Sequence, residues 1–123
     1  MNRGDIYMVD FEPTKGHEQQ RRPALAISSF MFNRATGTMI VVPIRSDGNF
    51  SRNLGISVEI TGTKKITGRA LSGQVRVLDI KAGAGQIVDK VDPSVVDHVA
   101  AQITAIINAK NRKIVLDCVT VVL

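Results

Sequence analysis

The 123-residue sequence is poor in residues on which several classes of protein depend. Its one cysteine, Cys118, excludes an internal disulfide and a cysteine zinc site, in agreement with a reducing compartment. The chain has no tryptophan, one tyrosine and four phenylalanines, too few for an aromatic platform that stacks RNA bases. It has no apolar run of about 18 residues, and MNRGDIYMVDF lacks the regions of a signal peptide. We therefore expect a cytoplasmic protein without a membrane span.

Positive charge, in contrast, is plentiful. Sixteen Lys and Arg against eleven Asp and Glu give a formal net charge of +5, and the apolar fraction of 44% is that of a globular protein with one core. A basic surface attracts polyanions such as nucleic acid, although it also serves solubility alone. The basic residues gather in two stretches, whose members are Arg21, Arg22, Arg45 and Arg52, then Lys64, Lys65, Arg69 and Arg76.

Short apolar runs predict that strands make up most of the chain. Some alternate with polar residues, as in DIYMVDF, and others are continuous, as in GTMIVVPI. The predicted strands are 5–11, 24–28, 37–44, 56–60, 69–71 and 75–80. FMFNRAT fits one helical turn between two of them, and RSDGNFSRN fits a long loop because it is rich in Gly, Asn and Ser.

The clearest helix signal comes late in the chain. Asp92 fits an N-cap position and Pro93 the first turn. An apolar face follows at helical spacing, made of Val96, Val99, Ala100, Ile103, Ile106 and Ile107. Beyond it KIVLDCVTVVL is β-branched and fits either an added edge strand or a mere extension. Strands first and one closing helix predict a small curved sheet or barrel.

The loop GHEQQRRP, residues 16–23, carries the most chemistry. Two successive arginines offer planar forks of donors suited to phosphate oxygens, and His17 and Glu18 can move protons. Loops between strands of a rigid sheet are common places for sites. The alternative is structural: a solvated basic face in which Glu18 pairs with the arginines. From the residues alone, both interpretations stay open.

Four motifs in order carry a family resemblance: RGDIYMVDFEPTKGHEQQRRPALAIS, FNRATGTMIVVPI, GNFSRN and TGRALSGQVRVLDIKA. Through them the sequence resembles the MazF/PemK/Kid toxin endoribonucleases of type II toxin–antitoxin systems. The resemblance implies a mainly β (α+β) fold, a small SH3-like, CcdB-type antiparallel β-barrel with a C-terminal α-helix. It places one toxin domain at 1–110 and leaves 111–123 as an atypical extension.

The resemblance also implies a function and partners. The expected activity is metal-independent, sequence-specific cleavage of single-stranded mRNA to 2′,3′-cyclic phosphate and 5′-hydroxyl ends, with no cofactor. The expected partners are a second copy in a homodimer, a cognate acidic antitoxin, and operator DNA through the antitoxin complex. The expected catalytic residues are Arg22, His17, Glu18, Ser46 and Arg45. The expected RNA-binding residues are Gln19, Gln20, Arg21, Asn49, Phe50, Arg52, Gln74 and Arg76.

The sequence departs from the family pattern at two places. Arg45 stands where many members carry threonine or serine, with Ser46 next, and Leu71 and Gly73 replace the arginine and aspartate of an Arg-x-Asp-Gln segment. These departures leave two alternatives open. The first is a catalytically impaired member that binds the antitoxin and co-represses its operator. The second is a gyrase-directed, CcdB-like toxin, which the GHEQQRRP loop disfavours.

Other kinds of site find little support in the sequence. Two histidines and one distant cysteine have no metal-ligand spacing, and the aspartates lack the calcium-loop pattern. KAGAGQ lacks the strand and helix context of a dinucleotide site. His98 falls within the predicted helix, where a structural role is expected. Phe50 fits base stacking or loop anchoring equally well.

Overall fold

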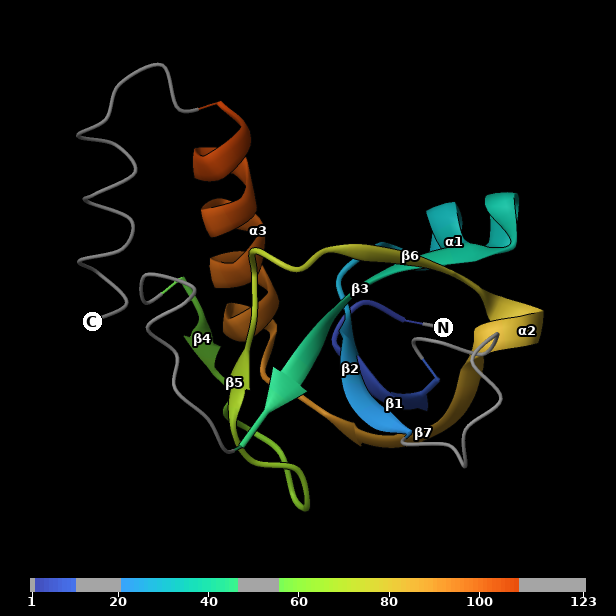
Figure 1. Ribbon diagram of the computed structural model, residues 1–123, viewed down its shortest axis with the longest axis horizontal. Helices are drawn as coiled ribbons and strands as arrows, with labels where there is room; N and C mark the ends of the chain where they lie inside the picture. The colour runs from blue at the N-terminus through green and yellow to red at the C-terminus, as the bar shows by residue number, and fades with distance from the viewer. Residues whose placement is uncertain (1, 11–20, 47–55, 109–123) are drawn as a thin grey trace.

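The computed structural model describes residues 2–10, 21–46 and 56–108, which form an antiparallel sheet and three helices (Figure 1). The strands are β1 (Asp5–Val9), β2 (Arg22–Ala26), β3 (Thr38–Arg45), β4 (Val58–Glu59), β5 (Arg69–Ala70), β6 (Arg76–Asp79) and β7 (Ala84–Lys90). The helices are α1 (Phe30–Thr36), α2 (Ile80–Gly83) and α3 (Pro93–Ile107). The expected class, a mainly β antiparallel fold with a late helix, is confirmed.

The sheet runs in the order β4-β5-β3-β2-β1-β7, and β6 also pairs with β3. β3 is long enough to serve two strands on one edge, since its first half pairs with β6 and its last two residues pair with β5. The two ends of the sheet meet after β4 and β7, where the Asp92 amide donates to the Thr61 carbonyl at 2.9 Å. The sheet is thus curved enough for its outermost strands to be joined.

Each face of the curved sheet carries its own apolar cluster. The first cluster lies under α3 and includes Ile6, Leu25, Val42 and Ile44 together with Val96 of the helix. The second lies on the opposite face and is formed by Tyr7, Val9, Ala24, Ala26, Met39 and Val41. Because strand residues alternate between faces, most of β1, β2 and β3 is buried on both sides, as the continuous apolar runs predicted.

Helix α3 begins as expected, but its apolar face differs from the predicted one. Asp92 holds the N-cap position, yet its side chain accepts from the Thr61 hydroxyl at 3.0 Å instead of capping the helix. Ile106 and Ile107 were expected in the core and are exposed, because the helix extends past the sheet at its C-terminal end. In the described part of the chain, no helix is long and apolar enough to cross a membrane.

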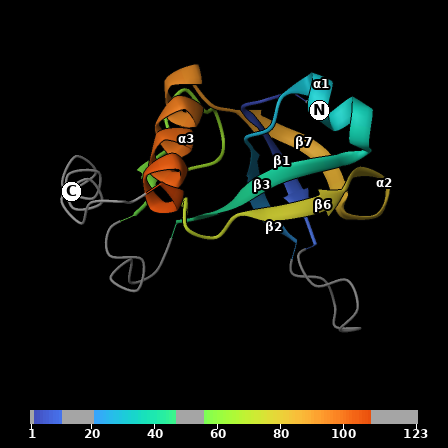
Figure 2. The ribbon, with the colours of Figure 1, turned by 90° about the horizontal axis from the view of Figure 1, so that it is seen from above.

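The helix expected in FMFNRAT is confirmed as α1, which lies directly before β3. Ser29 caps it by accepting from the Phe32 amide at 3.2 Å, and Gly37 ends it in the left-handed region, at φ 70°. Asn33 is fully buried and its amide donates to the Ser28 carbonyl at 3.3 Å. Figures 1 and 2 show α1 and α3 at opposite ends of the sheet.

The predicted strand boundaries are inexact, and one strand was missed. The strands expected at 24–28 and 37–44 are β2 and β3, each shifted along the chain, so that Arg22 begins a strand and does not lie in the expected loop. The strands expected at 5–11, 56–60 and 75–80 are β1, β4 and β6, each shorter than predicted. β7 and the one-turn α2 were not predicted, because AGQIVDK has neither a regular alternation nor a continuous apolar run. The loop was expected to begin at Arg45, but Arg45 is the last residue of β3; the rest of that loop from 47 on, and the segment 109–123, lie outside the described residues.

Candidate functional site

Two predicted site arginines stand where neighbouring strands separate. The β2–β3 ladder ends at the pair Ala24↔Pro43. Beyond that pair β2 stays beside β1, with Arg22 opposite Val9, whereas β3 continues to β5 (Figure 1). Arg22 and Arg45 are both exposed and lie on either side of this divergence. Because side chains alternate along a strand, Arg22 lies on the same face of the sheet as Ala24, and Arg45 on the same face as Val41. The candidate site therefore lies on the face of the second cluster.

A third arginine, not among the predicted site residues, faces Arg45 directly. Arg45 of β3 and Arg69 of β5 are paired across the strands. Gly68 makes the approach possible: it has φ 131°, and a Cβ on it would lie 2.4 Å from the Arg45 carbonyl oxygen. Any larger residue would push β5 away from the end of β3. The local signal was only a charged residue beside the apolar Ala70, which does not identify a strand partner.

Arg69 is held in place by Ser57, a residue that is 1% exposed just before β4. The arginine Nε donates to Ser57 Oγ at 2.6 Å and Nη2 donates to the Ser57 carbonyl at 3.3 Å. Gln102 of α3 donates to the same carbonyl at 3.3 Å. Glu59 is the cross-strand neighbour of Arg69, but no ion pair joins these two described residues.

Three predicted RNA-binding residues lie away from this divergence. A Cβ on Gly85 of β7 would be 2.8 Å from the Arg21 guanidinium, so Arg21 extends over β7. Arg76 pairs with Val41, four residues before Arg45, which is about 13 Å along β3. Gln74 is exposed in the turn after β5, where its amide donates to the Leu71 carbonyl at 3.0 Å.

Of the remaining predicted site residues, one is described by the structure and the others lie outside the described residues. Ser46 is exposed and directly follows Arg45, at the end of β3. Outside the described residues lie His17, Glu18, Gln19, Gln20, Asn49, Phe50 and Arg52. Their predicted roles stay predictions. The chain order places the first four between β1 and Arg22, and the last three between Arg45 and β4.

The two departures at 71 and 73 have different surroundings. Leu71 is 1% exposed and part of the packed interior, so its side chain cannot reach a substrate. Gly73 is exposed, and a Cβ on it would meet nothing within 4 Å. An aspartate at position 73 would therefore have room, whereas an arginine at position 71 would first have to leave the core.

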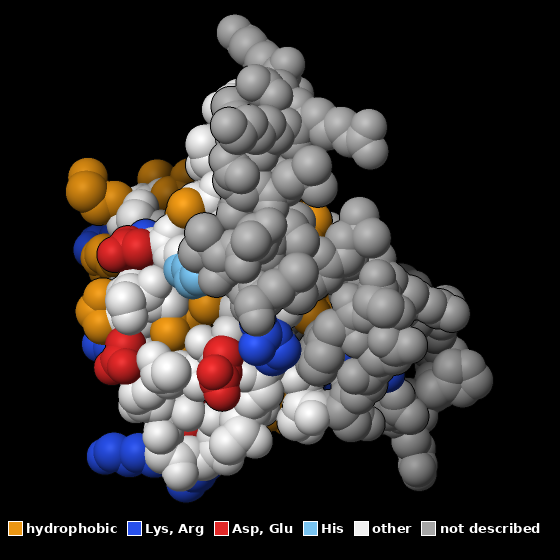
Figure 3. Space-filling view, turned by 90° about the vertical axis from the view of Figure 1, so that its left-hand side faces the viewer, with side chains coloured by type: hydrophobic (Ala, Val, Ile, Leu, Met, Phe, Trp, Pro, Cys, Tyr) orange, Lys and Arg blue, Asp and Glu red, His pale blue; other side chains and the backbone are white. Residues whose placement is uncertain are grey.

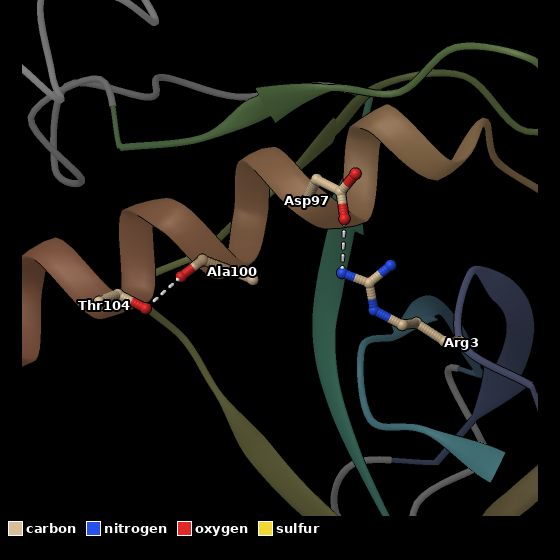
Figure 4. Close-up of polar contacts among 4 residues, drawn as sticks. All are labelled: Arg3, Asp97, Ala100 and Thr104. Atoms are coloured by element: carbon tan, nitrogen blue, oxygen red, sulfur yellow. Dashed lines mark hydrogen bonds and ion pairs between the residues drawn. The ribbon is translucent and has the colours of Figure 1, made fainter.

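A second charged cluster, formed by β7 and the connection between β4 and β5, pairs its charges closely. Asp89 of β7 accepts from the amides of Lys64, Lys65 and Ile66 at 2.6 to 3.1 Å, and from the Lys90 amide at 2.9 Å. Desolvation opposes ionisation of Asp89, but these donors outweigh it and lower its pKa well below the usual range. Nearby Arg3 donates to Asp97 of α3 at 2.8 Å (Figure 4). In the part of Figure 3 that is coloured by type, basic and acidic side chains alternate.

Tyr7 is a further buried polar group, in the second cluster. Burial, and then the negative charge of Asp5, raise the pKa of Tyr7 to about 12. Its hydroxyl has no hydrogen-bond partner among the described residues. In the described ranges 2–10, 21–46 and 56–108, no three His, Cys, Asp or Glu side chains come together as metal ligands would.

The comparisons with known proteins agree on one family. A family model described as "PemK-like, MazF-like toxin of type II toxin-antitoxin system" matches residues 2–107. The endoribonuclease PemK of Escherichia coli is 38% identical over 109 residues, which cover 87% of this chain and 82% of that protein. The endoribonuclease toxin ChpB of Escherichia coli K12 is 37% identical over 108 residues, covering 85% of this chain and 92% of that protein.

Solved structures agree on the fold. The MazE–MazF complex of Deinococcus radiodurans has a TM-score of 0.72 at 22% identity, covering 87% of this chain and 95% of the matched one. A mycobacterial endoribonuclease in complex with its cognate antitoxin has a TM-score of 0.68 at 18% identity, with coverages of 87% and 94%. At these identities the likeness concerns the fold alone.

Proposed function

The chain belongs to the PemK-like, MazF-like toxins of type II toxin–antitoxin systems, and we propose that it is a sequence-specific endoribonuclease. It cleaves single-stranded mRNA without a metal ion and so inhibits translation and growth. The observation that carries this proposal is the extent of the match, since residues 2–107 include every strand and helix that the structure describes. The exposed arginines at the divergence of β2 and β3 support it.

The chemistry needs a base, a cation and an acid. The base takes the proton of the RNA 2′-hydroxyl, whose oxygen then attacks the adjacent phosphorus. The charge that develops on the phosphorane is stabilised by fixed donors, and an acid protonates the departing 5′-oxygen. The products are a 2′,3′-cyclic phosphate and a 5′-hydroxyl, and the acid and base exchange protonation states.

Arg22 is assigned to the phosphorane. It begins a strand that is hydrogen-bonded to β1, so its backbone is fixed on a rigid element while its side chain is exposed. Its planar fork can hold two phosphate oxygens at once. The proton transfers are assigned to His17 and Glu18, because an imidazole titrates near neutral pH and a carboxylate is the rival base. Ser46 supplies a hydroxyl donor next to Arg45.

The proposed partners follow from the family and from the charge. A net charge of +5 suits a cognate acidic antitoxin as well as RNA. The chain forms a homodimer, and an antitoxin covers its basic surface. It reaches operator DNA only through the antitoxin complex. The place of action is the cytoplasm, where mRNA is translated.

The decisive test is cleavage of a long single-stranded RNA by the purified protein in the presence of EDTA, followed by mapping of the cut ends. We expect cuts at one short sequence, with 2′,3′-cyclic phosphate and 5′-hydroxyl ends, and no cuts in the same RNA annealed to its complement. RNA that is bound but never cut would support the catalytically impaired alternative. Inhibition of gyrase without any effect on RNA would support the CcdB-like one.

A further inference from the structure

We propose that Arg69 is an RNA-binding residue that acts with Arg45 as a clamp on one phosphodiester of the RNA backbone. This proposal rests on the proposed endoribonuclease function and adds a residue to its site. The clamp lies across β3 and β5, whereas Arg22 lies on β2 at the other side of the divergence. A strand of RNA that enters the divergence would then meet cations on both of its sides.

The pairing of two arginines is itself the first argument. Residues directly opposite in an antiparallel pair have Cβ atoms about 5 Å apart, and like charges at such positions destabilise the sheet. The nearest acidic cross-strand neighbour is Glu59, and no ion pair joins it to Arg69. Proteins keep such an unfavourable pairing at sites where it has a function. An anion between the two guanidinium groups would attract both of them.

The orientation of Arg69 is the second argument. A guanidinium group has five N–H donors. Ser57 accepts one from Nε and one from Nη2, which fixes the plane of the group and leaves three donors for another acceptor. Arg69 is half-buried, so it loses less conformational entropy on binding than a fully exposed side chain would. Arg45 is exposed and makes no described polar contact that would compete for the anion.

The backbone around the pair is the third argument. Gly68 allows the β5 backbone to approach the carbonyl of Arg45 more closely than a side chain would permit. The Gly68 carbonyl accepts from the Ile60 amide at 3.1 Å, which ties the same turn to the residue after β4. The two arginines are therefore positioned by the backbone of three strands and are pre-organised for a phosphate.

The test measures binding of a cleavage-resistant RNA at increasing salt. The RNA carries the mapped target sequence with a 2′-O-methyl group at the cleavage position, and binding is followed by fluorescence anisotropy. We expect Arg69→Gln to weaken binding by about tenfold, as the loss of a charged hydrogen-bonding group does. The slope of log K against log salt should fall by about 0.7, the value for one phosphate contact in a single strand.

Two further variants separate charge from structure. Arg69→Lys keeps the charge but loses the fork held by Ser57, so it should keep the wild-type slope and still bind more weakly. Arg34→Gln removes an exposed arginine from the last turn of α1, at the other end of the sheet, and should change the slope by much less than Arg69→Gln. If Arg69→Gln does not fold, Arg45→Gln probes the same clamp from its exposed side.

The outcomes are distinct. Wild-type RNA binding by Arg69→Gln, with an unchanged slope, would overturn the clamp. So would an Arg69→Gln variant that loses binding to an acidic peptide while it binds RNA like the wild type. An equal loss of slope in Arg34→Gln would also overturn it, because the effect would then reflect net charge only. A wild-type protein that neither binds nor cuts single-stranded RNA would instead overturn the proposed function.

Discussion

Two charged clusters of the curved sheet, one around Asp89 and one at Arg45 and Arg69, differ in how their charges are paired. Where β7 leads into α3, Asp89 accepts from four backbone amides and Arg3 pairs with Asp97. Where β3 ends, Arg45 and Arg69 face one another across paired strands without a carboxylate bound to either among the described residues. The first arrangement lowers the free energy of the folded chain by itself. The second does so only when an anion is present.

The contrast separates residues that maintain the fold from residues that we propose to bind a ligand. Structural sites satisfy their polar groups internally, whereas binding sites leave charge unsatisfied and rely on a rigid frame to hold it in place. Ser57 and Gly68 supply that frame for Arg69 and Arg45, one by hydrogen bonds and the other by the space that its missing side chain leaves. Loss of activity without loss of stability is therefore expected at Arg45 and Arg69, and loss of stability is expected at Asp89.

The largest effect is expected from Arg22→Ala. Removal of a group that stabilises charge in the transition state costs a factor of about 100 or more in rate. The free energy of unfolding should change little, because Arg22 is exposed at the first residue of its strand. Single-turnover cleavage of one mapped RNA and chemical denaturation measure the two quantities on the same preparation.

Arg22→Lys and Arg34→Ala are the matched variants for this comparison. The lysine keeps the charge but lacks the fork, so it should restore little of the rate. Arg34→Ala removes an exposed arginine far from the divergence of β2 and β3 and should cleave like the wild type. Cleavage by Arg22→Ala at the wild-type rate would remove Arg22 from the mechanism and would break the contrast between exposed arginines and paired charges.

How much of this could be read from the sequence depends on the range of each signal. The order of β1, β2, α1 and β3 follows from local apolar runs and from the cap at Ser29, and these elements were predicted. β7 has small and polar residues, and its pairing with β1 depends on residues about 80 positions apart. Sequence patterns within one segment do not contain such information.

The candidate site shows the same limit. The motifs make Arg22 and Arg45 candidates, but nothing local indicates that Arg69 faces Arg45, because register is set by the whole sheet. Gln102 was missed for a related reason: a polar residue on a helix is buried only when a distant acceptor, here the Ser57 carbonyl, is available. The predicted burial of Ile106 and Ile107 was wrong because helical spacing does not say where the sheet ends.

An intermediate effect, on stability, is expected from Asp89→Asn. The lowered pKa means that ionised Asp89 stabilises the folded chain above the unfolded-state pKa of about 4, and that this contribution is lost as the pH falls below it. The variant should lose about 1 to 3 kcal/mol at neutral pH, because several charge-assisted hydrogen bonds weaken together. Urea denaturation at neutral pH and at several values below about pH 4 measures the difference, which should shrink on acidification.

Asp97→Asn is the control for Asp89→Asn. Asp97 is exposed and forms one ion pair, with Arg3, so its loss should cost less than about 1 kcal/mol. Cleavage by Asp97→Asn should stay at the wild-type level, since the described ion pair of Asp97 is with Arg3 and not with Arg45 or Arg69. Equal stabilities of wild type and Asp89→Asn at neutral pH would show that the amide contacts contribute nothing net.

The smallest effect is expected from Tyr7→Phe, which tests whether every unsatisfied polar group in this fold has a function. The Tyr7 hydroxyl is buried without a partner among the described residues, and it lies within an apolar cluster. Removing such a hydroxyl relieves a desolvation cost and leaves the ring in place, so the free energy of unfolding should stay equal or rise by up to about 1 to 2 kcal/mol. Cleavage should be unchanged, because the reaction needs exposed donors at the strand ends.

Denaturation and single-turnover cleavage of Tyr7→Phe check both statements. A Tyr7→Phe variant that is less stable by more than about 1 kcal/mol would mean that the hydroxyl has a partner in the folded protein. A variant that keeps its stability but loses cleavage would extend the functional region from the exposed arginines into the core beneath them.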